Sequence, residues 1–325
     1  MHLQIMVVDN TEKNGCLHIC KRESADPDYY ISKYFLNDRS KKSGEIDEKF
    51  HEDIKKRSVP VTGRKQLTIY PDSVLNHQSD SMYYQLIDEE RNQRRLVKMD
   101  DELYKKLNGM SARIEKGVEQ YFIMEGKDYS KARHDYEINI IKDKRTVNAF
   151  AMPTGKIIFY TKILEIAEND DGIAAIMAHE MAHVLARHGK ERMSQAIAFN
   201  ILSNVVFGPS GNAMIDVLAQ LGFFLPFSRH QEAEADYLGL VFLTIAGYDP
   251  DEAKFLWLRM ENYAEGKREE ADKKGDITKK AEHRMPEFLK THPNHKKRQD
   301  NFEKWIPEVK EKYSSYILEE WNISD

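Results

Sequence analysis

The sequence predicts a mainly helical α+β domain that contains a small three-stranded sheet. Over residues 101–124, apolar side chains recur at spacings of three and four, which is typical of an amphipathic helix. Over residues 135–142, apolar and polar side chains alternate, which is typical of a strand. Helical spacing returns after residue 161 and continues to about residue 315, so we expect one small sheet rather than a β domain.

The N-terminal part is predicted to be a charged, weakly ordered extension over residues 1–58. Its first 57 residues hold 11 basic and 11 acidic side chains without a helical period. Cys16 and Cys20 lack the second pair that a zinc knuckle needs, and we interpret them as incidental thiols. From residue 59, the segment VPVTGR predicts an extended stretch and a turn.

The middle of the chain is predicted to alternate between helix and strand. Helices are expected over residues 79–91 and 101–124, the second capped by Asp100 or Asp101. Pro153-Thr154-Gly155 is a turn signal between two of the strands. The three strands are expected over residues 135–142, 148–152 and 156–160.

The C-terminal half is predicted to be helical. Asp170 or Asp171 is expected to cap a helix that ends near His188. Residues 265–284 carry 13 charges in 20 positions, and we interpret them as a mobile charged loop or a solvated helix. Further helices are expected over residues 190–207, 212–225, 229–246, 250–264 and 295–315. We therefore expect one domain over residues 59–315, followed by a tail at 316–325.

Composition excludes several classes of function. The chain has 49 basic and 54 acidic residues, a formal net charge of −5 and no long basic stripe, which argues against nucleic-acid binding. Its start lacks the basic region and the cleavage site of a signal peptide. No apolar run reaches the roughly 18 residues that a membrane span needs. The uncharged stretch between Arg192 and Arg229, broken only by Asp216, is interpreted as buried core, or as a surface that faces a membrane or apolar substrate.

The pattern His179-Glu180-Met181-Ala182-His183 is the main chemical signal. Residues four apart project from one helix face, so the two imidazoles can share one metal ion. Glu180 is one step round the helix, where it can reach a water on the metal. The flanking sequence is apolar, and buried polar groups need partners such as a metal. Two core histidines without a metal are the weaker alternative. We expect one Zn²⁺ per chain.

A third metal ligand is expected from a second helix. His188 lies about 140° round the helix from His183 and is expected to point away. Glu232 is the candidate ligand, and Asp236 shares its helix face, so one carboxylate can bind the metal while the other orients a histidine. Glu234, about 200° from Glu232, is expected to point outward.

These motifs together resemble peptidase family M48, the gluzincins, in its Oma- and BepA-like branch. The resemblance pairs HEMAH with the downstream EAEAD, and it covers about residues 59–310. Residues 147–153, VNAFAMP, resemble the family's substrate-aligning edge strand. The segments PEFL and THP, with Arg298 six residues after His292, resemble the family's closing motif. Residues 59–67, VPVTGRKQL, resemble the mature start of bacterial envelope members.

The resemblance implies a minigluzincin-type zincin fold and a set of residue roles. Zn²⁺ would be bound by His179, His183 and Glu232. Glu180 would be the general base, with Asp236 supporting the ligands from behind. His292 and Arg298 would lie near the metal, in gating or transition-state support. The substrate-binding edge strand would comprise Asn148, Ala149, Phe150 and Ala151.

Three functions fit this pattern. The first is a zinc-dependent metalloendopeptidase of protein quality control, acting on misfolded or membrane-associated polypeptides. The second is a chaperone-like binder of unfolded chains, with its zinc site gated shut by His292. The third is a metal hydrolase of small substrates, which a deep closed pocket would favour. The resemblance implies the cell envelope and peripheral membrane association, although no signal peptide or membrane span is visible. The oligomeric state is left open.

Overall fold

The structure is a computed structural model that describes residues 58–66, 68, 72–196, 226–273, 285–293 and 297–317. Its contacts divide the chain into two compact units. The first comprises Met1–Ser81 and Gly189–Leu225, and the second Met82–His188 and Pro226–Asp325. The charged extension, the helix expected over 212–225 and most of the uncharged stretch before it lie outside the described residues. The division into an extension, a domain and a tail stays a prediction.

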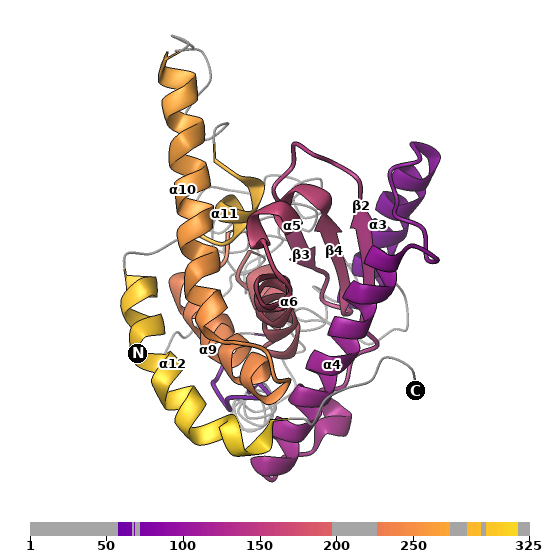
Figure 1. The fold of residues 1–325 in the computed structure, drawn as a ribbon. Helices are drawn as coiled ribbons and strands as arrows, with labels where there is room; N and C mark the ends of the chain where they lie inside the picture. The colour runs from indigo at the N-terminus through magenta and orange to yellow at the C-terminus, as the bar shows by residue number, and fades with distance from the viewer. Residues whose placement is uncertain are drawn as a thin grey trace, which may run out of the picture. The chain divides into compact units, whose positions relative to one another are not determined.

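The predicted three-stranded sheet is confirmed, with its first two strands slightly shorter than expected. The strand order is β2-β4-β3, with β2 parallel and β3 antiparallel to β4. Gly155 makes the turn between β3 and β4 at φ 87°, a conformation that glycine adopts without strain. The strands are β2 (Glu137–Ile141), β3 (Ala149–Ala151) and β4 (Lys156–Tyr160). β3 is thus a short strand with one strand neighbour among the described residues (Figure 1).

Two long helices precede the sheet. The side chain of Asp101 caps α4 by accepting from the Leu103 N–H. The predicted apolar stripe of α4 is buried from Leu107 to Phe122, and Leu103 at its start is half-buried. Gly117 lets the backbone of α4 approach the later helix α9, because a Cβ there would lie 3.1 Å from the Phe242 carbonyl oxygen. The elements are α3 (Asp72–Asn92), α4 (Glu102–Met124) and the short 3-10 turn η1 (Tyr129–Lys131).

The helix with the H-E-x-x-H pattern is α6 (Asp170–Leu185), which follows α5 (Thr161–Ala167). Its cap is Asn169, one residue before the aspartates expected from the sequence, and the Asn169 side chain accepts from the Gly172 N–H. Gly172 is required because a Cβ would lie 2.2 Å from the Ala167 carbonyl oxygen. From Gly172 onward every residue of α6 is buried, which explains why its sequence is apolar on all sides.

α6 ends earlier than predicted. Its last residue is Leu185, and Arg187 then adopts a left-handed backbone conformation at φ 55°. The chain is helical again over residues 188–196. His188 therefore follows a sharp change in chain direction and does not continue the helix.

The remaining helices surround α6 together with the sheet. In Figure 1, α6 lies near the centre of the second unit, with α9 and α10 on one side and the strands on the other. They are α9 (Arg229–Ile245), α10 (Asp251–Lys273), α11 (Glu287–Thr291), α12 (Lys297–Tyr313) and the 3-10 turn η3 (Ser314–Tyr316). The part of 265–284 up to Lys273 is helical rather than a loop.

Within the described residues, no helix has both the length and the apolar character that crossing a bilayer requires.

Candidate metal centre

The two histidines of α6 meet as the spacing predicts. The Nε2 atoms of His179 and His183 lie 3.0 Å apart. Both side chains are buried, with 5% and 4% of the residue exposed, and Glu180 between them is 1% exposed. α6 thus presents two imidazole nitrogens and a carboxylate to one closed site.

α9 brings the predicted carboxylate to these histidines. The helix begins at a capping box in which Ser228 and Gln231 bond reciprocally. One turn later, Glu232 Oε1 lies 3.3 Å from His183 Nε2, and its Oε2 lies 3.7 Å from His179 Nε2. α9 passes close to α6 at Gly239, where an added Cβ would make an ordinary van der Waals contact with the His179 backbone at 3.4 Å.

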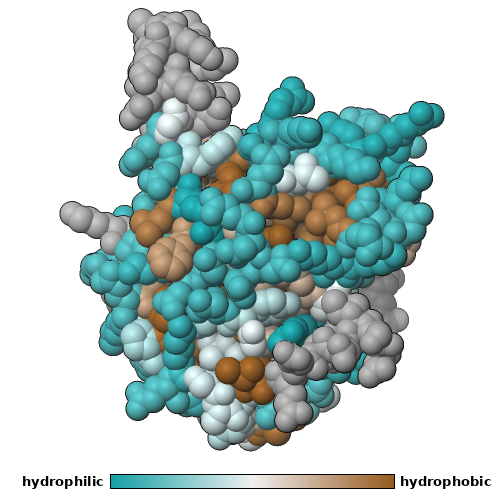
Figure 2. Space-filling model, viewed as in Figure 1, coloured by the Kyte–Doolittle hydropathy of each residue, from teal (hydrophilic) through white to brown (hydrophobic). Residues whose placement is uncertain are grey.

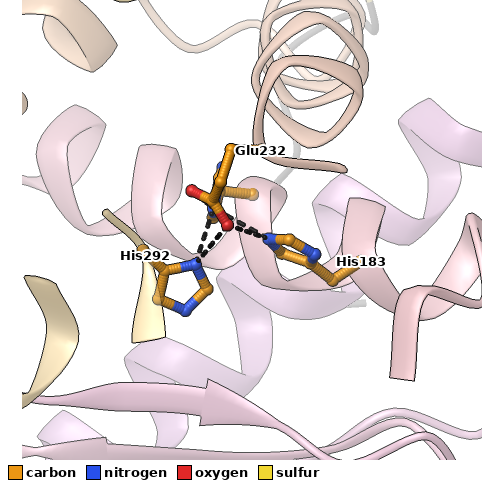
Figure 3. A group of neighbouring side chains, drawn as sticks. His183, Glu232 and His292 are labelled. Atoms are coloured by element: carbon orange, nitrogen blue, oxygen red, sulfur yellow. Dashed lines mark hydrogen bonds and ion pairs between the residues drawn. The ribbon is translucent and has the colours of Figure 1, made fainter. Parts of the chain in front are cut away.

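His292 is the fourth member of the cluster and comes directly after α11. Its Nδ1 lies 3.0 Å from Glu232 Oε1 (Figure 3) and 3.2 Å from His179 Nε2. Its Nε2 lies 3.3 Å from Glu180 Oε1. Rings of Phe227 and Phe288 stack on the imidazole at centroid distances of 5.0 and 4.6 Å. The sequence placed His292 only through the family resemblance, because a Thr-His-Pro turn carries no helical or strand register.

The four side chains fit a metal ion of zinc's size. His179, His183, Glu232 and His292 each offer one ligand atom, and these atoms all lie within 4.8 Å of one another. In a tetrahedral site with bonds of about 2.0–2.1 Å, ligand atoms lie about 3.3 Å apart. The nitrogen and oxygen atoms that make contacts between these side chains lie 3.0 to 3.7 Å from one another, a range that brackets that value.

The predicted supporting residues lie behind the ligands. Asp236 Oδ1 is 3.0 Å from His179 Nδ1, the nitrogen that faces away from the cluster. Arg298 donates from Nε and Nη2 to both oxygens of Asp236 at 2.7 Å, and from Nη2 to Glu232 Oε2 at 2.8 Å. Its guanidinium also lies over the Trp257 ring, 3.4 Å from the centroid. Arg298 therefore joins the two carboxylates.

The electrostatics of the cluster favour the protonation states that bind a metal. Burial lowers the pKa of His183 well below its ordinary value, and nearby His179 lowers it further, which keeps the imidazole neutral. Burial alone would raise the pKa of Glu232. Neighbouring His292 and Arg298 outweigh burial and hold this pKa well below its usual range. A neutral imidazole and an ionised carboxylate are the forms that metals bind.

The edge strand reaches the site through Glu180. Glu180 Oε2 accepts a hydrogen bond of 2.9 Å from the Ala151 N–H. The backbone bonds of Asn148 and Met152 go to β4, so the alternation of an antiparallel pair turns Ala149 and Ala151 toward the opposite edge. Phe150, between them, pairs with Ile158 of β4. The expected substrate strand thus lies directly beside the expected base.

Two residues near the site were judged wrongly from the sequence. His188 was expected to point away from His183, but their Nδ1 atoms lie 2.8 Å apart. Glu234 was expected to face outward, but its Oε2 lies 3.0 Å from His188 Nε2. The prediction failed because α6 ends at Leu185. Gly189, the stop signal in the sequence, lies four residues later.

Fold and site together define a zincin-like α+β domain, with an H-E-x-x-H helix, a glutamate from a second helix and a short edge strand. The chain belongs to peptidase family M48, whose family model matches residues 111–306.

Three relatives place the chain within this family. Mitochondrial metalloendopeptidase OMA1 of Saccharomyces cerevisiae is 38% identical over 180 residues, which cover 55% of this chain and 49% of the relative. OMA1 of Schizosaccharomyces pombe is 38% identical over 195 residues, covering 57% and 52%. The beta-barrel assembly-enhancing protease of Yersinia pestis is 26% identical over 160 residues, covering 45% and 30%. The chain thus spans about half the length of the OMA1 relatives from these two yeasts.

Proposed function

We propose that this protein is a zinc-dependent metalloendopeptidase. The observation that carries the proposal is the position of Glu180, whose carboxylate lies between the edge strand and a cluster of metal-binding side chains. Its Oε2 accepts from the Ala151 N–H at 2.9 Å, and its Oε1 lies 3.3 Å from His292. A general base in a metallopeptidase needs contact with both the metal-bound water and the peptide.

The proposed metal ligands are His179, His183 and Glu232, holding one Zn²⁺ per chain. Two histidines and a carboxylate are a frequent ligand set of catalytic zinc, and they leave a further position for water. Asp236 would orient His179 through Nδ1. Arg298 would hold Glu232 and Asp236 in place and balance their charge.

The chemistry then divides between the metal and the chain. Bound zinc would supply a water of lowered pKa and a positive charge for the developing oxyanion. Glu180 would accept the water proton at Oε1 as the oxygen attacks the peptide carbonyl, and would pass this proton to the leaving amine nitrogen. The hydrogen bond from Ala151 to Oε2 would keep Oε1 turned toward the cluster.

The proposed substrate is a polypeptide in extended conformation. It would add to the outer edge of β3, using the backbone groups of Ala149 and the carbonyl of Ala151, whose N–H is held by Glu180. Such recognition depends on backbone geometry and suits unfolded chains. In Figure 2, hydrophobic residues gather on the visible face over α5 and the neighbouring strands. This patch would favour the apolar segments that misfolded proteins expose.

We propose a role in quality control of misfolded or membrane-associated proteins, with peripheral membrane association. The names of two relatives, a mitochondrial metalloendopeptidase and a beta-barrel assembly-enhancing protease, support the proteolytic part of this role. The membrane part rests on the family resemblance of the sequence.

A second candidate, a binder of unfolded chains with a closed metal site, is favoured by His292. This side chain lies among the ligands and faces Glu180, so it would take the position that a catalytic water needs. Peptide hydrolysis would then require His292 to withdraw.

A hydrolase of small substrates finds less support. A cavity of about 10 Å³ lies beside His179 and Trp257, and it has room for about one water.

The proposal is tested by cleavage of unfolded casein in the presence of zinc. We expect cleavage by the wild type, and loss of cleavage in Glu180→Gln with zinc binding retained. Wild-type protein that binds zinc without cleaving casein would favour the second candidate. In that case His292→Ala should produce cleavage. Failure of both proteins to cleave would refute the endopeptidase.

A further inference from the structure

The proposed ligand His183 has a chain of polar side chains behind it. His183 Nδ1 lies 2.8 Å from Nδ1 of His188, and His188 Nε2 lies 3.0 Å from Glu234 Oε2. His188 is fully buried at 0% exposure, and the Glu234 side chain is 7% exposed. A charged carboxylate is rarely buried to this degree without a partner that uses its charge.

We propose that His188 and Glu234 form a positioning relay, which orients His183 for metal binding and fixes its tautomer. The inference rests on the proposed zinc site. It adds two residues that contact neither the metal nor the substrate, and that act only through His183.

The direction of each hydrogen bond follows from metal binding at one atom. His183 faces the cluster with Nε2, so that nitrogen must keep its lone pair, and Nδ1 must carry the proton. His183 Nδ1–H can therefore only donate, and His188 Nδ1 must accept. His188, being neutral, then carries its own proton on Nε2 and donates it to Glu234. The carboxylate at the end of the relay fixes the tautomers of both rings.

The relay supplies to His183 what Asp236 supplies directly to His179. The Nδ1 atom of His179 lies 3.0 Å from an Asp236 oxygen. Among the described contacts of His183 Nδ1, the partner is His188. The Glu234 carboxylate therefore acts on His183 only through the His188 imidazole. The Nδ1 atom of each histidine ligand is thereby linked to a carboxylate, which raises the basicity of the metal-binding Nε2 atom.

Packing and hydrogen bonding restrict different motions of His183. Its ring stacks on Phe227 with a centroid distance of 3.8 Å and an interplanar angle of 28°. Stacking sets the plane of the ring but does not distinguish its two nitrogens. The bond to His188 does, because only one ring orientation places a nitrogen at His188. Stacking alone would leave the flipped ring and the wrong tautomer accessible.

The local backbone is what turns His188 toward His183. On a continuous helix the two residues would lie about 140° apart. The left-handed conformation of Arg187, at φ 55°, ends α6 and redirects the chain. Such a conformation is uncommon for a residue with a side chain, and here it completes the relay.

The test is the zinc affinity of purified full-length variants, measured by competition with a chromophoric chelator. His188→Leu removes both hydrogen bonds, and we expect about 10- to 100-fold weaker zinc binding. His188→Asn keeps an acceptor near the position of Nδ1 and should lose less. Glu234→Gln keeps an acceptor for His188 but removes the charge, and should also lose less than His188→Leu.

Two further variants test whether a loss of zinc affinity comes from the orientation of His183 or from misfolding. His230→Leu changes an exposed histidine at the start of α9 and should bind zinc as the wild type does. If His188→Leu fails to fold because the Glu234 carboxylate then faces an apolar side chain, the double variant His188→Leu/Glu234→Leu removes that charge and should still bind zinc weakly.

The outcomes are distinct. A His188→Leu or double variant that binds zinc within about threefold of wild type, while His183→Ala binds none, would overturn the relay and leave the proposed function intact. Equal losses in His188→Asn and His188→Leu would assign His188 to packing and also overturn it. A wild type without zinc affinity would refute the proposed zinc site, and the relay with it.

Discussion

Replacement of Arg298 by Met should destabilise the metal-free protein strongly. Arg298 is 3% exposed and makes three charge-assisted hydrogen bonds to Asp236 and Glu232, which are 4% and 1% exposed. Burial lowers the pKa of the Arg298 guanidinium, but the two carboxylates raise it above its ordinary value overall, so the group is charged. Methionine has a similar length and no charge. It would leave two carboxylates buried without their cation.

The expected cost follows from the unpaired charge. Removal of one partner from a buried ion pair costs about 3–5 kcal/mol of unfolding free energy. For a domain of this size each kcal/mol lowers Tm by about 2–4 °C, so the fall in Tm should be on the order of 6–20 °C. Saturating zinc should restore part of it, because the metal takes over the charge of Glu232.

The assay is urea unfolding with and without a zinc chelator, followed by circular dichroism. Arg91→Met is the matched control, because Arg91 pairs with Asp88 on an exposed face where both side chains are more than 60% exposed. Such surface pairs contribute about 0–1 kcal/mol. A metal-free Arg298→Met protein within about 1 kcal/mol of wild type would refute the reasoning that Arg298 balances the buried carboxylates.

Three further predictions concern stability. Gly172→Ala should lower the free energy of unfolding by at least about 1–3 kcal/mol, because its Cβ would meet the Ala167 carbonyl oxygen at 2.2 Å. Gly266→Ala, with no atom within 4 Å of the new Cβ, should raise it by about 0.5–1 kcal/mol. Equal changes in the two variants, measured by chemical denaturation, would contradict this prediction. Burial lowers the pKa of His134 from 6.5 to about 4, so its contribution to stability is present above pH 6.5 and is lost as the pH falls toward 4. His134→Leu should therefore reduce the fall in unfolding free energy between pH 6.5 and pH 4 by at most about 3 kcal/mol. A pH profile of stability equal to that of the wild type would contradict this prediction. Zinc chelation should lower the wild-type Tm but leave that of His183→Ala unchanged, as scanning calorimetry can verify; equal shifts in both proteins would count against the metal site.

Much of the fold could be predicted from local pattern. The alternation in 135–142 and the turn at Gly155 predicted the strands because side-chain direction in a strand depends only on neighbours in sequence. The same holds for His179 and His183, whose proximity follows from one turn of helix. The cap of α6 was misjudged by one residue, because Asn169, Asp170 and Asp171 all have capping side chains.

Long-range geometry was only partly accessible. Glu232 was a candidate ligand because it shares a helix face with Asp236, whereas His292 entered only through the family resemblance. The two lie 53 and 113 residues from His179, and no periodicity connects elements so far apart. Arg298 was expected near the metal, but that it joins the two carboxylates depends on how α12 packs against α9.

The end of α6 separates most clearly what the sequence determines from what only the tertiary structure determines. Residue types and spacing were sufficient for a helix with a metal-binding face, because helical periodicity is a local property. They could not place His188 and Glu234, since one left-handed residue, Arg187, redirects the chain. The energy of that conformation is offset by packing and hydrogen bonds that exist only once α6 and α9 have come together, so this part of the site was decided by the tertiary structure.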